Sequence, residues 1–232
     1  MRNDKNTRVL VVASHPDDEV LGCGGTIAHH AENGATVEVV FLTKGVAARI
    51  GNEGDILSLQ DQRLGMAREA AKILGAKAPI FLDFPDQGLD TCALLDITQK
   101  LEQVVRELTP DIIYTHHGGD LNLDHRLAHQ AVLTACRPLP QTSVKAIYSF
   151  ETVSSTEWAS NEMGGAFTPN RFVDITHQLD RKLEALGAYD IELREFPHAR
   201  SLESVKALAC HRGVSVGVHA AEAFMVVREI IS

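Results

Sequence analysis

Four ionisable side chains occupy five consecutive positions near the start of the chain, within the segment SHPDDE at positions 14–19. Carboxylates packed this closely raise one another's pKa by repulsion unless a cation neutralises them, and a divalent metal is the usual cation. A mixture of imidazole and carboxylate ligands suits zinc, although other first-row divalent metals are also accepted. The segment therefore predicts one part of a metal site.

A second cluster, HHGGDLNLDH at positions 116–125, offers the rest of the site. A catalytic zinc takes about three protein ligands and keeps one position open. Spacing alone leaves His125 and His129 as equal candidates, because they lie one helical turn apart. A lone His or Asp in such a loop is more often a cap or a solvated side chain, and Asp17 is also placed to cap a helix. Two clusters at equivalent loops of one sheet favour the metal.

The elements that must position these clusters alternate between strands and helices. Apolar runs predict strands and three-to-four spacing predicts amphipathic helices, with Gly34 and Gly75 each ending a helix. We expect strands at 8–14, 36–43, 79–82, 111–115 and 144–150, and helices at 21–33, about 64–74, 94–108 and 125–136. Right-handed crossovers then place helices on both faces of a mainly parallel sheet, as in a Rossmann-like three-layer α/β/α sandwich. Both clusters follow strands, so they should face the same sheet edge.

The rest of the chain is less regular. A polar loop at 151–170 precedes helices at 176–189 and 201–212 and a strand at 223–227. No linker or shift in composition divides the chain, so we expect a single domain spanning residues 1–232.

Composition excludes several kinds of partner. The 31 acidic and 22 basic residues among 232 give a net charge of −9, and no Lys or Arg run could follow a nucleic-acid backbone. No apolar stretch is long enough to span a membrane, and a polar start leads directly into a strand, which predicts a cytoplasmic protein. Four cysteines without any CxxC pair argue against a disulfide framework and against a thiolate zinc site.

The apolar strand that runs into HPDDE at positions 15–19 resembles the first signature of the LmbE-like, or PIG-L, family of zinc-dependent N-deacetylases. The resemblance continues through EVLGCGGT at 19–26, Arg63, LG at 74–75, LDFPD at 82–86, DHR at 124–126 and AEAF at 221–224, and so covers most of the chain. It implies one zinc per chain. It further implies that His15, Asp18 and His125 are the zinc ligands, with Asp17 left free as the general base.

The sequence departs from the family at Asn122. Many members carry a histidine there that stabilises the oxyanion and protonates the leaving amine. Asn122 can donate a hydrogen bond but cannot supply a proton, so Asp17 could serve both proton transfers. Alternatively His198 could enter the site, including across a subunit boundary as in some relatives, although a histidine in a Pro-flanked loop is more often structural or exposed.

The resemblance also implies the substrate, an N-acetylated amino sugar of the N-acetylglucosamine type on a small conjugate. The reaction would be hydrolysis of a linear amide, a carbon–nitrogen bond other than a peptide bond. Arg63, Asp86 and Asp124 would contact the substrate, while a helix-surface arginine and a loop carboxylate are equally good readings of Arg63 and Asp86. Trp158 could stack on a sugar or lie in the core. The acidic surface disfavours a membrane lipid, and relatives often form homo-oligomers, either trimers or hexamers.

Two alternatives belong to other classes. A metal-dependent hydrolase of another bond, such as a phosphoester, would normally use two metals and more carboxylates. A non-catalytic module that binds a sugar nucleotide would need a glycine-rich loop directly after a strand, whereas GCGG at 22–25 follows the acidic cluster.

Overall fold

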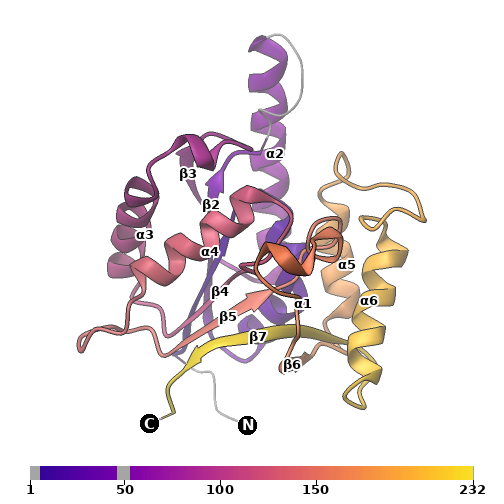
Figure 1. Cartoon of the computed structure of the whole chain (residues 1–232). Coiled ribbons are helices and arrows are strands. Elements are labelled where there is room, and N and C mark those ends of the chain that lie inside the picture. Colours follow the sequence, from indigo (N-terminus) through magenta and orange to yellow (C-terminus); the bar gives the residue numbers. More distant parts are fainter. Residues whose placement is uncertain (1–5, 46–52, 232) are drawn as a thin grey trace.

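The protein is built on one seven-stranded sheet with the strand order β3-β2-β1-β4-β5-β7-β6 (Figure 1). The computed structural model describes residues 6–45 and 53–231, so residues 1–5 of the expected polar start lie outside it. The strands are β1 (Arg8–Ala13), β2 (Thr36–Thr43), β3 (Ile80–Phe84), β4 (Ile112–His116), β5 (Ala146–Phe150), β6 (Arg171–Asp174) and β7 (Ala221–Glu229). The first five run parallel, whereas β7 is antiparallel to both β5 and β6. The expected mainly parallel sheet is confirmed.

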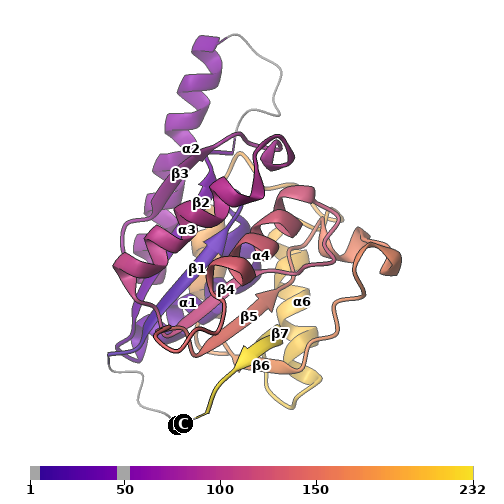
Figure 2. The same ribbon diagram turned by 60° about the vertical axis from the view of Figure 1, so that its left-hand side comes forward.

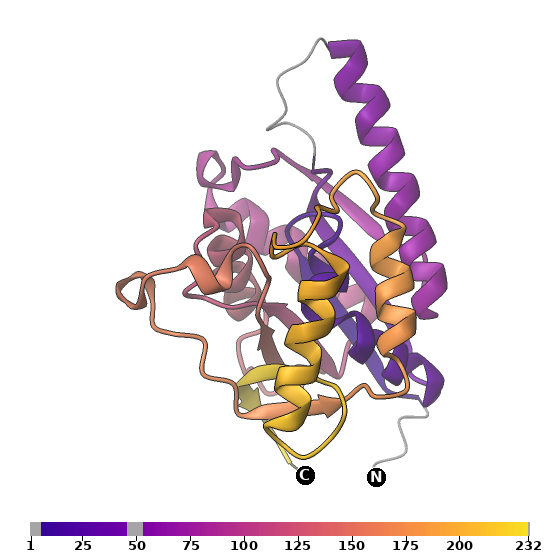
Figure 3. The same ribbon diagram turned by 90° about the vertical axis from the view of Figure 1, so that its right-hand side faces the viewer.

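Helices cover both faces of this sheet. They are α1 (Asp18–Glu32), α2 (Glu53–Leu74), α3 (Leu94–Leu108), α4 (Leu123–Ala135), α5 (Leu179–Gly187) and α6 (Leu202–Val214), with short 3-10 turns at Leu89–Thr91, Thr156–Trp158 and Asn161–Met163. Helices α3 and α4 pack together on one face (Figure 2), while α1, α2, α5 and α6 lie on the other (Figure 3). The molecule is therefore a three-layer α/β/α sandwich.

Side chains along β1 point alternately into two hydrophobic cores, one on each face of the sheet. Val9, Val11 and Ala13 belong to the core under α1, α2 and α5, while Leu10 and Val12 belong to the core under α3 and α4. A strand buried on both faces needs an unbroken apolar run, which is why this segment contains no polar residue between Arg8 and Ser14.

Several elements differ from the sequence expectation, and the largest difference is α2, which begins at Glu53 and not near residue 64. Helix α1 begins at Asp18 rather than at residue 21, because the carbonyl of Asp17 already accepts the N–H groups of Val20 and Leu21. Helix α5 is shorter than expected. Strand β6 was not expected, because its four residues RFVD carry too weak a pattern and it forms by pairing with β7. No helix in the described ranges is long and apolar enough to cross a membrane.

Candidate active site

The two polar clusters meet at the carboxyl ends of β1 and β4, which are adjacent parallel strands. The first cluster leads from β1 into α1, and the second leads from β4 into α4. Parallel strands end at the same edge of a sheet, where ligands of such folds bind. The expected shared edge is confirmed.

A buried carboxylate joins two histidines at this edge. Oδ2 of Asp18 lies 3.1 Å from Nδ1 of His15 and 3.3 Å from Nε2 of His125. Burial acts to raise the pKa of Asp18, but the neighbouring histidines, His125 foremost, hold it well below its usual value. Nε2 of His125 is buried and, although Asp18 lies 3.3 Å away, it makes no hydrogen bond of good geometry. Two ring nitrogens and one ionised carboxylate facing one another form a donor set that fits zinc.

Each of the two histidines is held from its other nitrogen by a carboxylate. Nε2 of His15 lies 3.1 Å from Asp124, and Nδ1 of His125 lies 3.1 Å from Asp120. Burial opposes ionisation of Asp120, yet the bond to His125 and the hydroxyl donors Ser155 and Thr156 lower its pKa to about 2. Carboxylates placed this way fix the tautomer and the ring orientation of metal-binding histidines.

A second metal-capable group shares one residue with the first. It comprises His15, Asp86 and Asp124. This group would need Nε2 of His15, which lies 3.5 Å from Asp86, and would leave the buried Nε2 of His125 without a partner. The set of His15, Asp18 and His125 is the better fit, because it uses that nitrogen and keeps a carboxylate behind each ring.

Two other histidines lie near the cluster, and His116 is the closer one, with its Nε2 3.5 Å from Asp18. Nδ1 of His129 lies 2.8 Å from the carbonyl of His116, away from the cluster. Nε2 of His116 accepts the backbone N–H of Ser14 at 2.9 Å, and its ring stacks on His125 at 3.8 Å. Burial and the neighbouring His125 hold the pKa of His116 well below its usual value, which agrees with the acceptor role of its Nε2 toward Ser14.

Asp17 lies beside the cluster between two arginines. Its backbone has φ 117°, in the left-handed region, and its Oδ2 accepts a hydrogen bond from Arg200 at 3.0 Å. Oδ1 lies 3.6 Å from Arg63, whose Nη1 also contacts Glu192 at 3.0 Å. Burial raises the pKa of Asp17 to about 6, against the lowering effect of Arg200 and Arg63. The Asp17 carboxylate is thus buried and oriented, and its raised pKa lies near enough to neutral pH for it to accept and release a proton.

The family model described as PIG-L, GlcNAc-PI de-N-acetylase, matches residues 10–136, a span that holds both clusters. The chain belongs to this PIG-L family. It is 34% identical over 180 residues to the uncharacterized deacetylase YaiS of Escherichia coli K12, covering 75% of this chain and 85% of that protein. It is also 31% identical over 202 residues to 4-oxalmesaconate hydratase of Pseudomonas putida KT2440, covering 79% of this chain and 73% of that protein.

A solved structure shares the whole fold. The conserved protein TT1542 from Thermus thermophilus matches with a TM-score of 0.76 and 26% identity, covering 97% of this chain and 96% of that chain. The structural similarity therefore extends past the segment that the family model matches.

Within this PIG-L chain, Asn122 caps α4. Its Oδ1 accepts the N–H of Asp124 at 2.9 Å, and its Nδ2 donates to Gln87 at 3.3 Å. Nε2 of Gln87 in turn lies 3.2 Å from His15. The Asn122 amide is therefore at the edge of the site, one side chain away from His15.

The expected substrate contacts are more deeply tied to the protein than the sequence suggested. Arg63 is buried and donates to the carbonyls of Pro16 and Gly45, so the reading as a helix-surface arginine is wrong. Both oxygens of Asp124 are engaged, one by His15 and one by the N–H of Leu89. Asp124 thus contacts His15 and Arg63 lies near Asp17, so both side chains hold groups of the site in position.

His198 and Arg200 lie on the loop between α5 and α6, beyond the segment matched by the PIG-L model. His198 is exposed, accepts the backbone N–H of Arg200, and contacts Trp158 with ring centroids 6.3 Å apart. Trp158 is 56% exposed, so it is not a core residue. The side chain that this loop sends to Asp17 is Arg200.

Sequence reasoning missed Arg200 and gave no role to Asp120. Asp120 precedes His125 by five residues inside the second cluster, and a carboxylate near a candidate metal ligand is a signal that could have found it. Arg200 gives no such signal, because nothing in a single sequence links it to Asp17.

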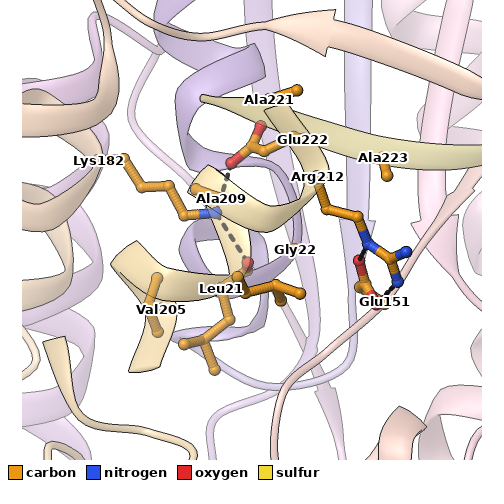
Figure 4. A pocket seen from close by; sticks show the side chains of 11 residues that line it. Leu21, Gly22, Glu151, Lys182, Val205, Ala209, Arg212, Ala221, Glu222 and Ala223 are labelled. Atoms are coloured by element: carbon orange, nitrogen blue, oxygen red, sulfur yellow. Dashed lines mark hydrogen bonds and ion pairs between the residues drawn. The ribbon is translucent and has the colours of Figure 1, made fainter. Parts of the chain in front are cut away.

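A buried ion pair supports the helix that carries Asp18. Helix α1 is kinked at Cys23, which frees backbone groups on both sides of the break. Glu222 accepts the freed N–H of Thr26 at 2.6 Å. Lys182 donates to the carbonyl of Leu21 at 2.9 Å and to Glu222, as Figure 4 shows. The pair replaces the helical hydrogen bonds lost at the kink.

Proposed function

We propose that this chain is a zinc-dependent hydrolase that removes the N-acetyl group from an N-acetylated amino sugar of the N-acetylglucosamine type. The observation that carries the proposal is the buried set of His15, Asp18 and His125 with Asp17 beside it. Membership of a family described by a de-N-acetylase, and similarity to a protein described as a deacetylase, support amide hydrolysis.

One zinc per chain would be held by Nδ1 of His15, the Asp18 carboxylate and Nε2 of His125. When bound, it supplies a Lewis acid that polarises a carbonyl and makes water a better nucleophile. Another first-row divalent metal could fill the same donor set.

The protein's own groups handle the protons. Asp17 takes a proton from the water that attacks the acetamide carbonyl, and Asn122 donates a hydrogen bond to the developing oxyanion. Since Asn122 has no proton to give, Asp17 passes the proton on to the nitrogen as the carbon–nitrogen bond breaks, which releases acetate and the free amine. We retain His198 as the alternative acid, because a partner subunit could bring that exposed ring to a neighbouring site.

The surrounding side chains take distinct parts in this scheme. Arg63 and Arg200 hold the Asp17 carboxylate, and Asp124 orients His15. Asp86, whose Oδ1 accepts from Thr43 at 3.2 Å, lies at the same edge and would contact a sugar hydroxyl.

The deciding experiment combines metal analysis with acetate release. Zinc-loaded protein should contain about one zinc per chain and release acetate from the methyl glycoside of N-acetylglucosamine. Asp17→Asn should keep the zinc and lose at least about 100-fold of the rate. Undiminished acetate release by Asp17→Asn, or full activity in metal-free protein, would contradict the proposal.

A second candidate is hydration of a carbon–carbon double bond, because one relative is described as a hydratase. The absorbance of a conjugated dicarboxylate would then fall on incubation with the protein, while no acetate would be released from the glycoside.

We further propose that the chain forms one domain, because a single sheet joins strands from its first and last segments. We also propose that it acts in the cytoplasm on a small-molecule substrate. Assembly into a homotrimer or homohexamer is the remaining expectation, and sedimentation velocity would test it.

A further inference from the structure

A pocket of about 420 Å³ lies next to the candidate active site. Its walls come from the loop after β5, from the segment that leads into α6, and from the first turns of α6 itself. The lining residues are Glu151, Val153, Glu157, Trp158, Pro197, His198, Ala199, Ser204 and Leu208.

This pocket shares two of these walls with the site. In the loop after β5, Val153 and Trp158 line the pocket, while Ser155 donates to Asp120 behind the metal ligand. In the other segment, His198 lines the pocket. Two residues later Arg200 donates to Asp17, and its Nε also donates to Ser154 at 2.7 Å, which ties the two walls together. The pocket and the site are therefore built on the same two segments of the chain.

The lining combines an aromatic surface with hydrogen-bonding groups. Trp158 is 56% exposed and stands at 82° to the His198 ring. Ser204 accepts a hydrogen bond from Ser201 at 2.9 Å, which leaves its own hydroxyl hydrogen to donate. An aromatic ring beside hydroxyl and imidazole groups recognises a ring that has one apolar face and polar edges, and a sugar is such a ring.

The charge of the lining selects against anions. Glu151 and Glu157 both line the pocket, and no Lys or Arg does among the described residues. Glu151 is paired with Arg212 at 2.8 and 2.7 Å, and Glu157 accepts the N–H groups of Ser154 and Ser155. A phosphate or carboxylate group in the pocket would meet these two carboxylates, and no lysine or arginine among the described lining residues would be there to pair with it.

We propose that this pocket is a subsite for a second, uncharged sugar ring joined to the N-acetylated sugar, with Trp158 as its stacking surface. The inference rests on the proposed function and narrows the substrate to a glycoside of at least two rings. Trp158 is the chain's only tryptophan, so its fluorescence reports on this subsite alone.

The test measures binding to zinc-loaded Asp17→Asn protein, which should not turn the ligands over. The probes are the methyl glycoside of N-acetylglucosamine, N,N'-diacetylchitobiose and N-acetylglucosamine 1-phosphate. The two-ring probe should bind about tenfold more tightly than the methyl glycoside and change the Trp158 emission. The 1-phosphate should bind no more tightly than the methyl glycoside. Equal affinity for one and two rings, or tightest binding of the 1-phosphate, would overturn the subsite.

Variants of the stacking surface test its location. By calorimetry, Trp158→Ala in the same background should lose the preference for two rings, and Trp158→Phe should keep most of it. Leu95→Ala, which removes an equally exposed apolar side chain from α3, is the matched control. A preference that survives Trp158→Ala would contradict the proposal.

Acetate release by the wild-type protein separates the two proposals. Two-ring preference in binding without any acetate release would leave the subsite standing and refute the proposed function. Acetate release with equal kcat/KM for one-ring and two-ring substrates would support the proposed function and refute the subsite.

Discussion

Arg200 donates a hydrogen bond to Asp17 at 3.0 Å although the two residues are 183 positions apart in the chain. The contact connects the loop before α6 with the left-handed residue that precedes α1. The hydrogen bond engages Oδ2 of Asp17, the candidate base, while Arg63 lies 3.6 Å from Oδ1. The base is therefore positioned by side chains from two distant segments.

Arg200 should act through the position of Asp17. We expect Arg200→Ala to lower kcat about 100-fold, because a misplaced catalytic group loses the benefit of orientation, with a smaller change in KM. Arg200→Lys should recover part of the rate, since it restores the charge without the guanidinium fork. Steady-state kinetics on an acetylated glycoside would measure both.

The matched control is Arg194→Ala. The Arg194 side chain is exposed and donates to the carbonyls of Ile191 and Leu193 within the same loop, while its backbone N–H, which the substitution keeps, donates to the carbonyl of Arg200. A loss in this control equal to that in Arg200→Ala would show that the loop, rather than the contact with Asp17, sets the rate.

Metal content should distinguish His125 from His129. His125→Ala removes a ring nitrogen that faces Asp18, so bound zinc should be lost, whereas His129→Ala removes only a contact with the carbonyl of His116. Asp120→Asn should keep the ligand but weaken zinc binding about 10- to 100-fold, because it disturbs the carboxylate behind His125. Elemental analysis and competition with a chelator would report the two effects. Retention of zinc by His125→Ala would refute the ligand assignment.

The two roles of Asn122 can be separated. Serine is a good N-cap, so Asn122→Ser should change the free energy of unfolding by less than about 0.5 kcal/mol, while Asn122→Ala should cost about 1 kcal/mol. Both variants remove the amide donor at the site edge, so both should lower kcat by at least about tenfold. Urea unfolding and acetate release give the two quantities. An unchanged kcat in both variants would leave Asn122 as a cap alone.

The Lys182 and Glu222 pair should be costly to break. Both side chains are only 4% exposed, so Lys182→Met would leave the Glu222 carboxylate buried without its cation and should lower the free energy of unfolding by about 3–5 kcal/mol. The double variant Lys182→Met with Glu222→Gln should recover part of this loss, because it removes the unpaired charge. Lys72→Met breaks the exposed contact with Glu69 and should change stability by less than about 1 kcal/mol. Equal effects of Lys182→Met and Lys72→Met in urea unfolding would contradict this account.

The sequence by itself determined the fold class and the sheet edge at which the two polar clusters meet. The apolar run of β1 could only be a strand buried on both faces, and the alternation with helices required a mainly parallel sheet. The clusters after β1 and β4 had to meet at one edge, because parallel strands share their carboxyl ends. These conclusions depend on patterns that are local in the chain, and the sequence carries such patterns directly.

The tertiary structure decided which side chains face one another. Whether His125 or His129 faces Asp18 depends on the direction of α4. That Arg200, and not His198, reaches Asp17 depends on how the loop before α6 folds. Strand β6 likewise exists only because β7 offers it hydrogen-bonding partners. Contacts between segments far apart in the chain follow from packing, and no spacing within a single sequence encodes them.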